Sequence, residues 1–194
     1  MTSNEESQDN PVPSLNPLLD KLFKSRSISI FGQIDEKIAR GVTEQLLALA
    51  AESDDPITVY ISSPGGHVES GDVIYDMIKF IKPEVRVIGT GWVASAATTI
   101  YLAAAKENRY SLPNTRYLVH QPHGGSAGDA TDIKIQAEQI VKTRERINKL
   151  ISDETGTPLE QVEKDTDRDY WMTVAEAKEY GIVTKVIRNV SEMD

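Results

Sequence analysis

The sequence has no cysteine among its 194 residues. Disulfide bonds, thiolate nucleophiles and metal sites with thiolate ligands are therefore excluded. Long hydrophobic runs are missing too, because no window of about 18 apolar residues occurs. The opening residues also lack the basic and apolar regions of a signal peptide. Neither membrane insertion nor export is indicated, and we expect a cytoplasmic protein.

Basic residues are scarce: 21 Lys and Arg stand against 30 Asp and Glu, and the formal net charge is −9. Nucleic acids and anionic membranes are bound by clustered Lys and Arg, so we expect neither as a partner. The hydrophobic content of 39% is enough for one core. Residues 1–16 are polar, acidic and without Lys or Arg, which predicts a mobile segment before a single domain over 17–194.

Two hydrophobic periods alternate along the rest of the chain. Alternating apolar residues predict strands over 27–32, 57–61, 84–90, 116–120 and 182–187. Apolar residues three and four apart predict helices over 38–49, 73–81, 95–105, 131–155 and 173–181. Gly156 ends the longest helix, and Thr173 with Glu176 forms a capping box at the start of the last one. Strands that alternate with helices predict an α/β domain with its function in the loops at the strand ends.

The stretch GWVASAA, residues 91–97, places one hydroxyl among small neighbours at a predicted strand-to-helix turn. Ser95 then lies at a helix N-terminus, where free backbone N–H groups favour developing negative charge. A nucleophile for acyl transfer needs such donors for its oxyanion. The alternative is a serine that only caps the helix. The G-x-S-x-G pattern of other hydrolases is not present, because Val93 and Ala97 occupy the glycine positions.

A serine nucleophile needs a base, and the chain has three histidines, His67, His120 and His123. His120 ends a predicted strand, whereas His67 lies in a loop after SSPGG. Each of them alone also fits a structural histidine. A carboxylate cannot be chosen unaided from 30 acidic residues. The run DTDRDYW, residues 165–171, stands out for the acids around Arg168, but a solvated charged turn explains that pattern equally well.

Four segments together resemble the proteolytic subunit family of the Clp protease. They are SSPGG (62–66), GWVASAA (91–97), SLPNTRYLVHQPHGG (111–125) and DTDRDYWMTVAEAKEYGIV (165–183). The similarity extends from about Arg26 to Ile187 in one order. It implies a ClpP-like, crotonase-like fold, which is an α/β stack of ββα units with a long protruding handle helix over about 131–155.

The resemblance also assigns the site. In the family the serine of the A-S motif is the nucleophile, the histidine of HQP is the general base, and the second aspartate of D-R-D orients the histidine. These roles fall on Ser95, His120 and Asp169. The chain order of the three differs from that of other serine hydrolases, so the triad is identified by role. The family's oxyanion hole, made of backbone N–H groups, corresponds to Gly66 and Ala96.

Further expectations follow from the same resemblance. A peptide substrate adds as an extended strand along Gly124 and Gly125. Asp167 and Arg168 form contacts between two stacked heptameric rings of identical subunits. Unfolded polypeptides and short peptides are the substrates, an AAA+ unfoldase is a possible partner, and neither a metal nor an organic cofactor is required.

The sequence departs from the family pattern in three places. Ala96 stands where the family has Met, and Trp92 is bulkier than the residue expected there. The family segment that forms axial pore loops and contacts the unfoldase has no visible counterpart before Leu19. Two alternatives stay open: an acyl-CoA enzyme, since the crotonase fold hosts that chemistry as well, and a noncatalytic scaffold subunit.

Overall fold

A seven-stranded sheet forms the centre of the structure, a computed structural model that describes residues 17–193. The parallel strands lie in the order β1 (Ser27–Phe31), β2 (Ile57–Ser63), β3 (Val85–Ala94), β4 (Arg109–Ser111) and β7 (Lys185–Val186). Two strands leave this path: β5 (Arg116–Val119) pairs parallel with β3, and β6 (Tyr170–Thr173) pairs antiparallel with β5. The predicted mobile segment 1–16 lies outside the described residues.

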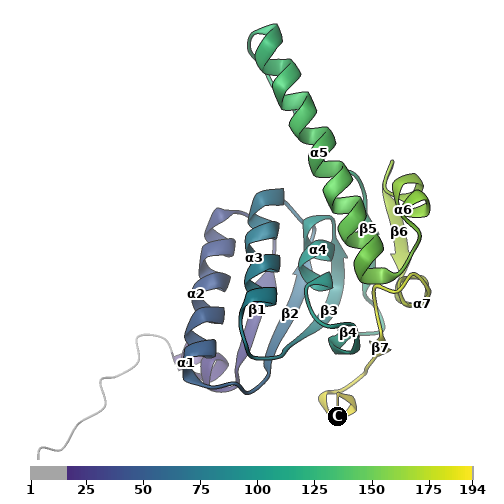
Figure 1. The fold of residues 1–194 in the computed structure, drawn as a ribbon. Helices are drawn as coiled ribbons and strands as arrows, with labels where there is room; N and C mark the ends of the chain where they lie inside the picture. The colour runs from purple at the N-terminus through teal and green to yellow at the C-terminus, as the bar shows by residue number, and fades with distance from the viewer. Residues whose placement is uncertain (1–16, 194) are drawn as a thin grey trace, which may run out of the picture.

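Seven α-helices accompany the sheet within the described residues. They are α1 (Pro17–Lys24), α2 (Glu36–Glu52), α3 (Val68–Phe80), α4 (Ala96–Leu102), α5 (Ala130–Thr155), α6 (Leu159–Asp165) and α7 (Val174–Glu179), with short 3-10 turns at Lys106–Asn108 and Val190–Glu192. Helices α2, α3 and α4 lie side by side over the sheet (Figure 1). Helix α2 buries one apolar stripe that includes Val42, Leu46 and Leu49, whereas every residue of α4 is buried. Within residues 17–193, every helix is too short or too polar to cross a bilayer.

Strand β3 is longer than the sequence predicts. It continues past Thr90 into the first four residues of the GWVASAA stretch and ends at Ala94. Residues 87–89 pair with β4 and residues 92–94 pair with β5. Gly91 lies between the two halves with a φ of 64°, a left-handed conformation that suits glycine and lets the strand change partner. Ser95 therefore follows a paired strand directly.

Helix α5 protrudes from the body of the molecule (Figure 1) and closely matches the predicted long helix. Its buried residues, Ile147, Asn148, Ile151 and Thr155, belong to its C-terminal part. Ile133 and Ile135 near its start are 43% and 47% exposed. The helix ends at Gly156, which adopts the left-handed conformation typical of a C-cap.

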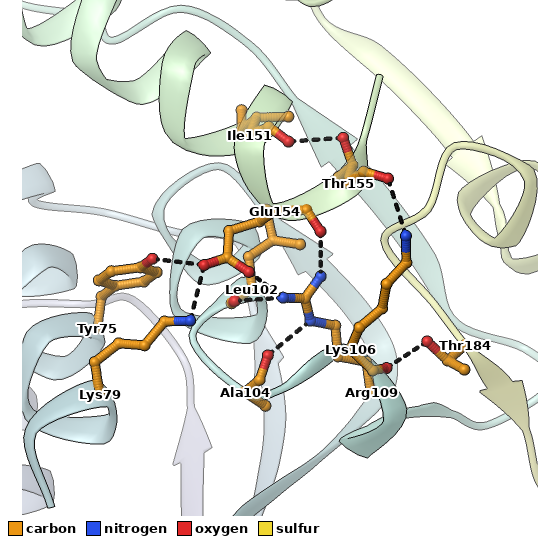
Figure 2. Close-up of polar contacts among 10 residues, drawn as sticks. All are labelled: Tyr75, Lys79, Leu102, Ala104, Lys106, Arg109, Ile151, Glu154, Thr155 and Thr184. Atoms are coloured by element: carbon orange, nitrogen blue, oxygen red, sulfur yellow. Dashed lines mark hydrogen bonds and ion pairs between the residues drawn. The ribbon is translucent and has the colours of Figure 1, made fainter. Parts of the chain in front are cut away.

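The base of α5 is held by a buried arginine (Figure 2). Arg109, at the start of β4, is 1% exposed and donates to the backbone carbonyls of Leu102, Ala104 and Glu154 at 2.8–2.9 Å. It also forms an ion pair with the Glu154 carboxylate. That carboxylate forms a second ion pair with Lys79 of α3, at 2.8 Å. The polar groups at this end of the helix are thereby satisfied, and α5 is fixed to both α3 and the sheet.

Candidate active site

Ser95 lies between β3 and α4, at the N-cap position of the helix. Its φ of 57° and ψ of −124° are rare for a residue with a side chain. The hydroxyl makes no capping hydrogen bond to the helix. Instead, Ser95 Oγ lies 2.7 Å from Nε2 of His120. The alternative that this serine only caps a helix therefore does not describe its contacts.

His120 follows the last residue of β5 and connects Ser95 to an acidic residue. Its Nδ1 lies 3.0 Å from Oδ1 of Asp169, which immediately precedes β6. The antiparallel pairing of β5 with β6 brings together these two residues, which are 49 positions apart in the chain. The His120 side chain is 14% exposed and that of Asp169 is 62% exposed. The structure thus brings together all three residues predicted as a triad.

The environment of His120 favours a neutral imidazole. Burial lowers its pKa below the ordinary value of 6.5, and the neighbouring His123 lowers it further, while Asp169 acts in the opposite direction. The His123 ring makes an edge contact with the His120 ring at 4.5 Å between centroids. A neutral imidazole that donates Nδ1–H to Asp169 presents the Nε2 lone pair to the serine hydroxyl. His120 is therefore able to accept the Ser95 proton at neutral pH.

The other two histidines are placed differently. His67 Nδ1 lies 2.9 Å from Ser70 Oγ, and His67 Nε2 lies 3.1 Å from the Glu69 carboxylate, so its contacts are at the start of α3. His123 contacts the His120 ring through its own ring. Of the three candidates for the base, His120 is the one hydrogen-bonded to Ser95.

The two predicted oxyanion donors lie in segments that adjoin Ser95. Ala96 begins α4, so its N–H has no acceptor within the helix. Gly65 lies beside it, because a Cβ added to Gly65 would be 3.1 Å from the Ala96 nitrogen. Next in sequence, Gly66 forms a parallel bridge with Ile34. In that bridge the neighbours Gly65 and His67 make the hydrogen bonds to Ile34, which turns the Gly66 N–H away from Ile34.

The predicted substrate strand at Gly124 and Gly125 is not a strand in this structure, since residues 121–127 have no ladder partner. The chain leaves the sheet after His120, where Pro122 lacks the N–H that a ladder needs. Residues 122–125 and 66–69 nonetheless line one groove, with Gln136 and Gln139 of α5. The groove leads past the Gly66 backbone, so an extended peptide has room beside the predicted site.

Sequence reasoning missed Gln121, which directly follows His120 and hydrogen-bonds to the loop before Asp169. Its backbone N–H donates to the Thr166 carbonyl at 2.6 Å, and its side-chain Nε2 donates to the Asp167 carbonyl at 2.7 Å. Arg168 also donates to the Asp167 carbonyl, at 3.0 Å, and both Asp167 and Arg168 are exposed. The signal available in the sequence was that Gln121 directly follows His120, the predicted base.

No set of three or more His, Asp or Glu side chains within residues 17–193 is arranged to hold a metal ion.

Comparison with known proteins places the chain in a family. The Clp protease family model matches residues 12–190. A relative from Rhizobium etli, an ATP-dependent Clp protease proteolytic subunit 3, is 55% identical and covers 98% of this chain and 100% of its own length. An ATP-dependent Clp protease proteolytic subunit 2 from Pseudomonas aeruginosa is 50% identical over 91% of this chain and 87% of its own length. ClpP1 from Listeria monocytogenes superposes with a TM-score of 0.84 at 55% identity, covering 91% of this chain and 99% of the other.

The chain belongs to the Clp protease family, as the four sequence segments predicted. It has the ClpP fold and is a serine peptidase of the proteolytic-subunit type. The acyl-CoA enzyme and the noncatalytic subunit, which the sequence left open, are not favoured by these matches.

Proposed function

We propose that Ser95, His120 and Asp169 cleave peptide bonds as a catalytic triad. Ser95 Oγ attacks the scissile carbonyl carbon while His120 Nε2 takes the hydroxyl proton, and His120 then returns a proton to the leaving amine. Water hydrolyses the resulting acyl-enzyme through the same base. The observation that carries the proposal is the continuous pair of hydrogen bonds, 2.7 Å from Ser95 to His120 and 3.0 Å from His120 to Asp169.

The negative charge of the tetrahedral intermediate is stabilised by the backbone N–H groups of Gly66 and Ala96. Such preorganised donors act only where charge develops and remove about 3–4 kcal/mol from the barrier each. The N-terminus of α4 adds its positive dipole end at the same place. The substrate is an extended, unfolded polypeptide or a short peptide that lies along Gly124 and Gly125 in the groove beside Gly66.

The subunit works inside an assembly in the cytoplasm. Two stacked heptameric rings enclose the active sites, Asp167 and Arg168 contact the opposite ring, and α5 packs against its counterpart there. The exposed apolar residues Ile133, Ile135 and Val141 on the protruding helix support this placement. An AAA+ unfoldase feeds the chamber, in keeping with the words "ATP-dependent" in the names of the relatives.

Hydrolysis of two substrates without ATP tests this function. A short unstructured peptide diffuses into a chamber and should be cleaved by the subunit alone. A stable folded domain should resist, because its unfolding costs about 5–15 kcal/mol that the subunit does not supply. Rapid degradation of the folded domain without an ATPase would contradict the enclosed chamber, and failure to cleave the peptide would contradict the peptidase itself.

A further inference from the structure

A pocket opens beside the proposed nucleophile, between α3 and α5. Ser95 and His120 lie on one side of it, and Val68 and Ile147 contribute apolar walls. Asp72, an ionisable side chain outside the triad, lines the same pocket. Because the pocket adjoins Ser95, the side chain next to a carbonyl carbon attacked by Ser95 is the part of a substrate that this pocket is placed to receive. The charge of the pocket wall therefore acts on the residue that precedes the scissile bond.

The carboxylate of Asp72 is paired with an arginine of α5. Arg146 of α5 donates through Nη1 to Asp72 Oδ1 at 3.0 Å and through Nη2 to Asp72 Oδ2 at 2.5 Å. The Asp72 side chain is 23% exposed and that of Arg146 is 49% exposed. The pair is partly open to water, so solvent screening limits what it contributes to the stability of the fold.

Two further carboxylates lie on the same helix as Asp72, although Asp72 is the acidic residue that lines the pocket. Glu69, Asp72 and Asp76 follow one another at spacings of three and four on α3, which places them on the same helix face. The hydrogen bonds that Arg146 donates to Asp72 are the main cause of the raised pKa of Arg146. Burial opposes this rise, and the charges of Asp72, Asp76 and Glu69 add to it. A carboxylate offers about four acceptor positions, and the arginine uses two of those on Asp72.

We propose that Asp72 and Arg146 determine which side chain the enzyme accepts before the scissile bond. Uncharged apolar side chains bind against Val68 and Ile147 without disturbing the pair. Acidic side chains are repelled by the carboxylate of Asp72, which lines the pocket. Basic side chains bind poorly, because the Asp72 carboxylate is already paired with Arg146. This inference rests on the proposed peptidase function of Ser95.

Three peptides that differ only in the residue before the scissile bond, Leu, Lys or Glu, test the inference through kcat/KM. The unsubstituted enzyme should prefer Leu. Arg146→Gln frees the Asp72 carboxylate and should raise the Lys-to-Leu ratio about tenfold, the scale on which single pocket groups discriminate. Asp72→Asn combined with Arg146→Gln should return that ratio to the original value, because the gain requires the carboxylate.

Two further variants separate pocket charge from damage to the protein. Lys149→Gln removes a positive charge from α5, the helix that also contains Arg146. Lys149 pairs with Asp153 and not with Asp72, so this variant should leave the rates for all three peptides unchanged. Arg146→Lys keeps the charge but loses the two-pronged contact, and should give a smaller rise in the Lys-to-Leu ratio than Arg146→Gln. Labelling by a fluorophosphonate without a peptide portion reports whether the nucleophile is intact in each variant.

The outcomes distinguish this inference from the proposed function. Normal labelling with an unchanged Lys-to-Leu ratio in both Arg146 variants would overturn the role of the pair while leaving the peptidase in place. An unsubstituted enzyme that is neither labelled nor active on any peptide would overturn the proposed function and the pocket's role with it. A ratio that rises in Arg146→Gln and falls back in the double variant supports the inference.

Discussion

A Cβ atom placed on Gly65 would lie 2.7 Å from the Cβ of Ser95. The same atom would lie 2.6 Å from the carbonyl oxygen of Ala94, and Gly65 has a φ of 91°. Real Cβ atoms do not approach backbone and side chains this closely, so the loop before α3 has room beside Ser95 only because residue 65 is glycine. A change in the packing of this loop would therefore also change the geometry around Ser95.

Gly65→Ala should consequently impair catalysis more than folding. The added methyl group displaces the loop that contains Gly66, and loss of one oxyanion donor lowers kcat by about 10²–10³-fold. Gly41→Ala is the matched control, because Gly41 lies in α2 and a Cβ there meets no atom within 4 Å. Steady-state peptide hydrolysis measures both. Equal activity in the two variants would contradict the proposed oxyanion site.

The pH dependence of kcat/KM should reflect the lowered pKa of His120. Burial and His123 lower that pKa, and only the neutral imidazole accepts the serine proton. Activity should therefore persist below pH 6.5, the ordinary value for histidine, and be lost as the pH falls through the lowered pKa of the free enzyme.

His123→Gln should move the acidic limb of this profile to higher pH. The substitution removes the ring whose electrostatic effect lowers the pKa of His120, while Asp169 continues to favour protonation of His120. His67→Gln serves as the control, since the His67 ring bonds to Ser70 and Glu69 instead. An acidic limb that shifts equally in both variants would show that proximity to His120 is not the cause.

The buried pair at the base of α5 should matter for stability. Arg109→Met leaves the Glu154 carboxylate without its buried partner, although Lys79 and Tyr75 still contact it. We expect a loss of about 3–5 kcal/mol in the free energy of unfolding, the range for breaking a buried ion pair by removing one partner. Lys149→Met, which breaks an exposed pair on the same helix, should change stability little. Chemical denaturation at one protein concentration compares them.

The contribution of Glu154 should disappear in acid. Burial by itself raises the pKa of this carboxyl, but Lys79, Tyr75 and Arg109 together lower it below 4.5. A lowered pKa in the folded state gives stability that is present above the unfolded value and lost as the pH falls through the folded value. The difference in stability between the unsubstituted protein and Glu154→Gln should therefore shrink below pH 4.5. A constant difference would contradict an ionised Glu154.

Arg168→Ala should weaken assembly and turnover together. In the proposed double ring, Arg168 contacts the opposite ring, and one peptide bond joins it to Asp169, which orients His120. We expect native mass spectrometry to show more single rings and peptide turnover to fall in the same sample. Arg40→Ala removes an exposed arginine that pairs with Glu44 within α2, and should alter neither. Single rings with full activity would contradict the coupling.

Local sequence patterns were sufficient for much of the fold. Apolar spacing predicted the long helix 131–155, which the structure has at Ala130–Thr155. The capping box of Thr173 and Glu176 is formed at the start of α7. These features depend on residues three or four positions apart, so a single sequence contains their causes. The final strand was predicted over 182–187 but the structure has it at Lys185–Val186, because the backbone N–H groups of Ile182 and Val183 donate to the Ala177 carbonyl of α7.

Features that depend on distant contacts could not be predicted. The positive φ of Ser95 and the extension of β3 arise from pairing with β5, which no local pattern encodes. Neither the pairing of Arg109 with Glu154 nor that of Asp72 with Arg146 was expected, because 45 and 74 residues separate the partners. Without the family motif, the three histidines and 30 acidic residues would have left the base and its carboxylate unresolved.

Fluorophosphonate labelling followed by peptide mapping tests the central claim, that Ser95 is a nucleophile activated by His120, most directly. We predict one adduct per subunit, on Ser95, with labelling and hydrolysis both lost in Ser95→Ala and strongly reduced in His120→Ala but not in His67→Ala. Removing the nucleophile or its base lowers kcat by about 10⁶-fold in a well-studied serine protease, so the expected loss is far outside experimental error. An adduct on another residue, or full hydrolysis by Ser95→Ala, would contradict the account.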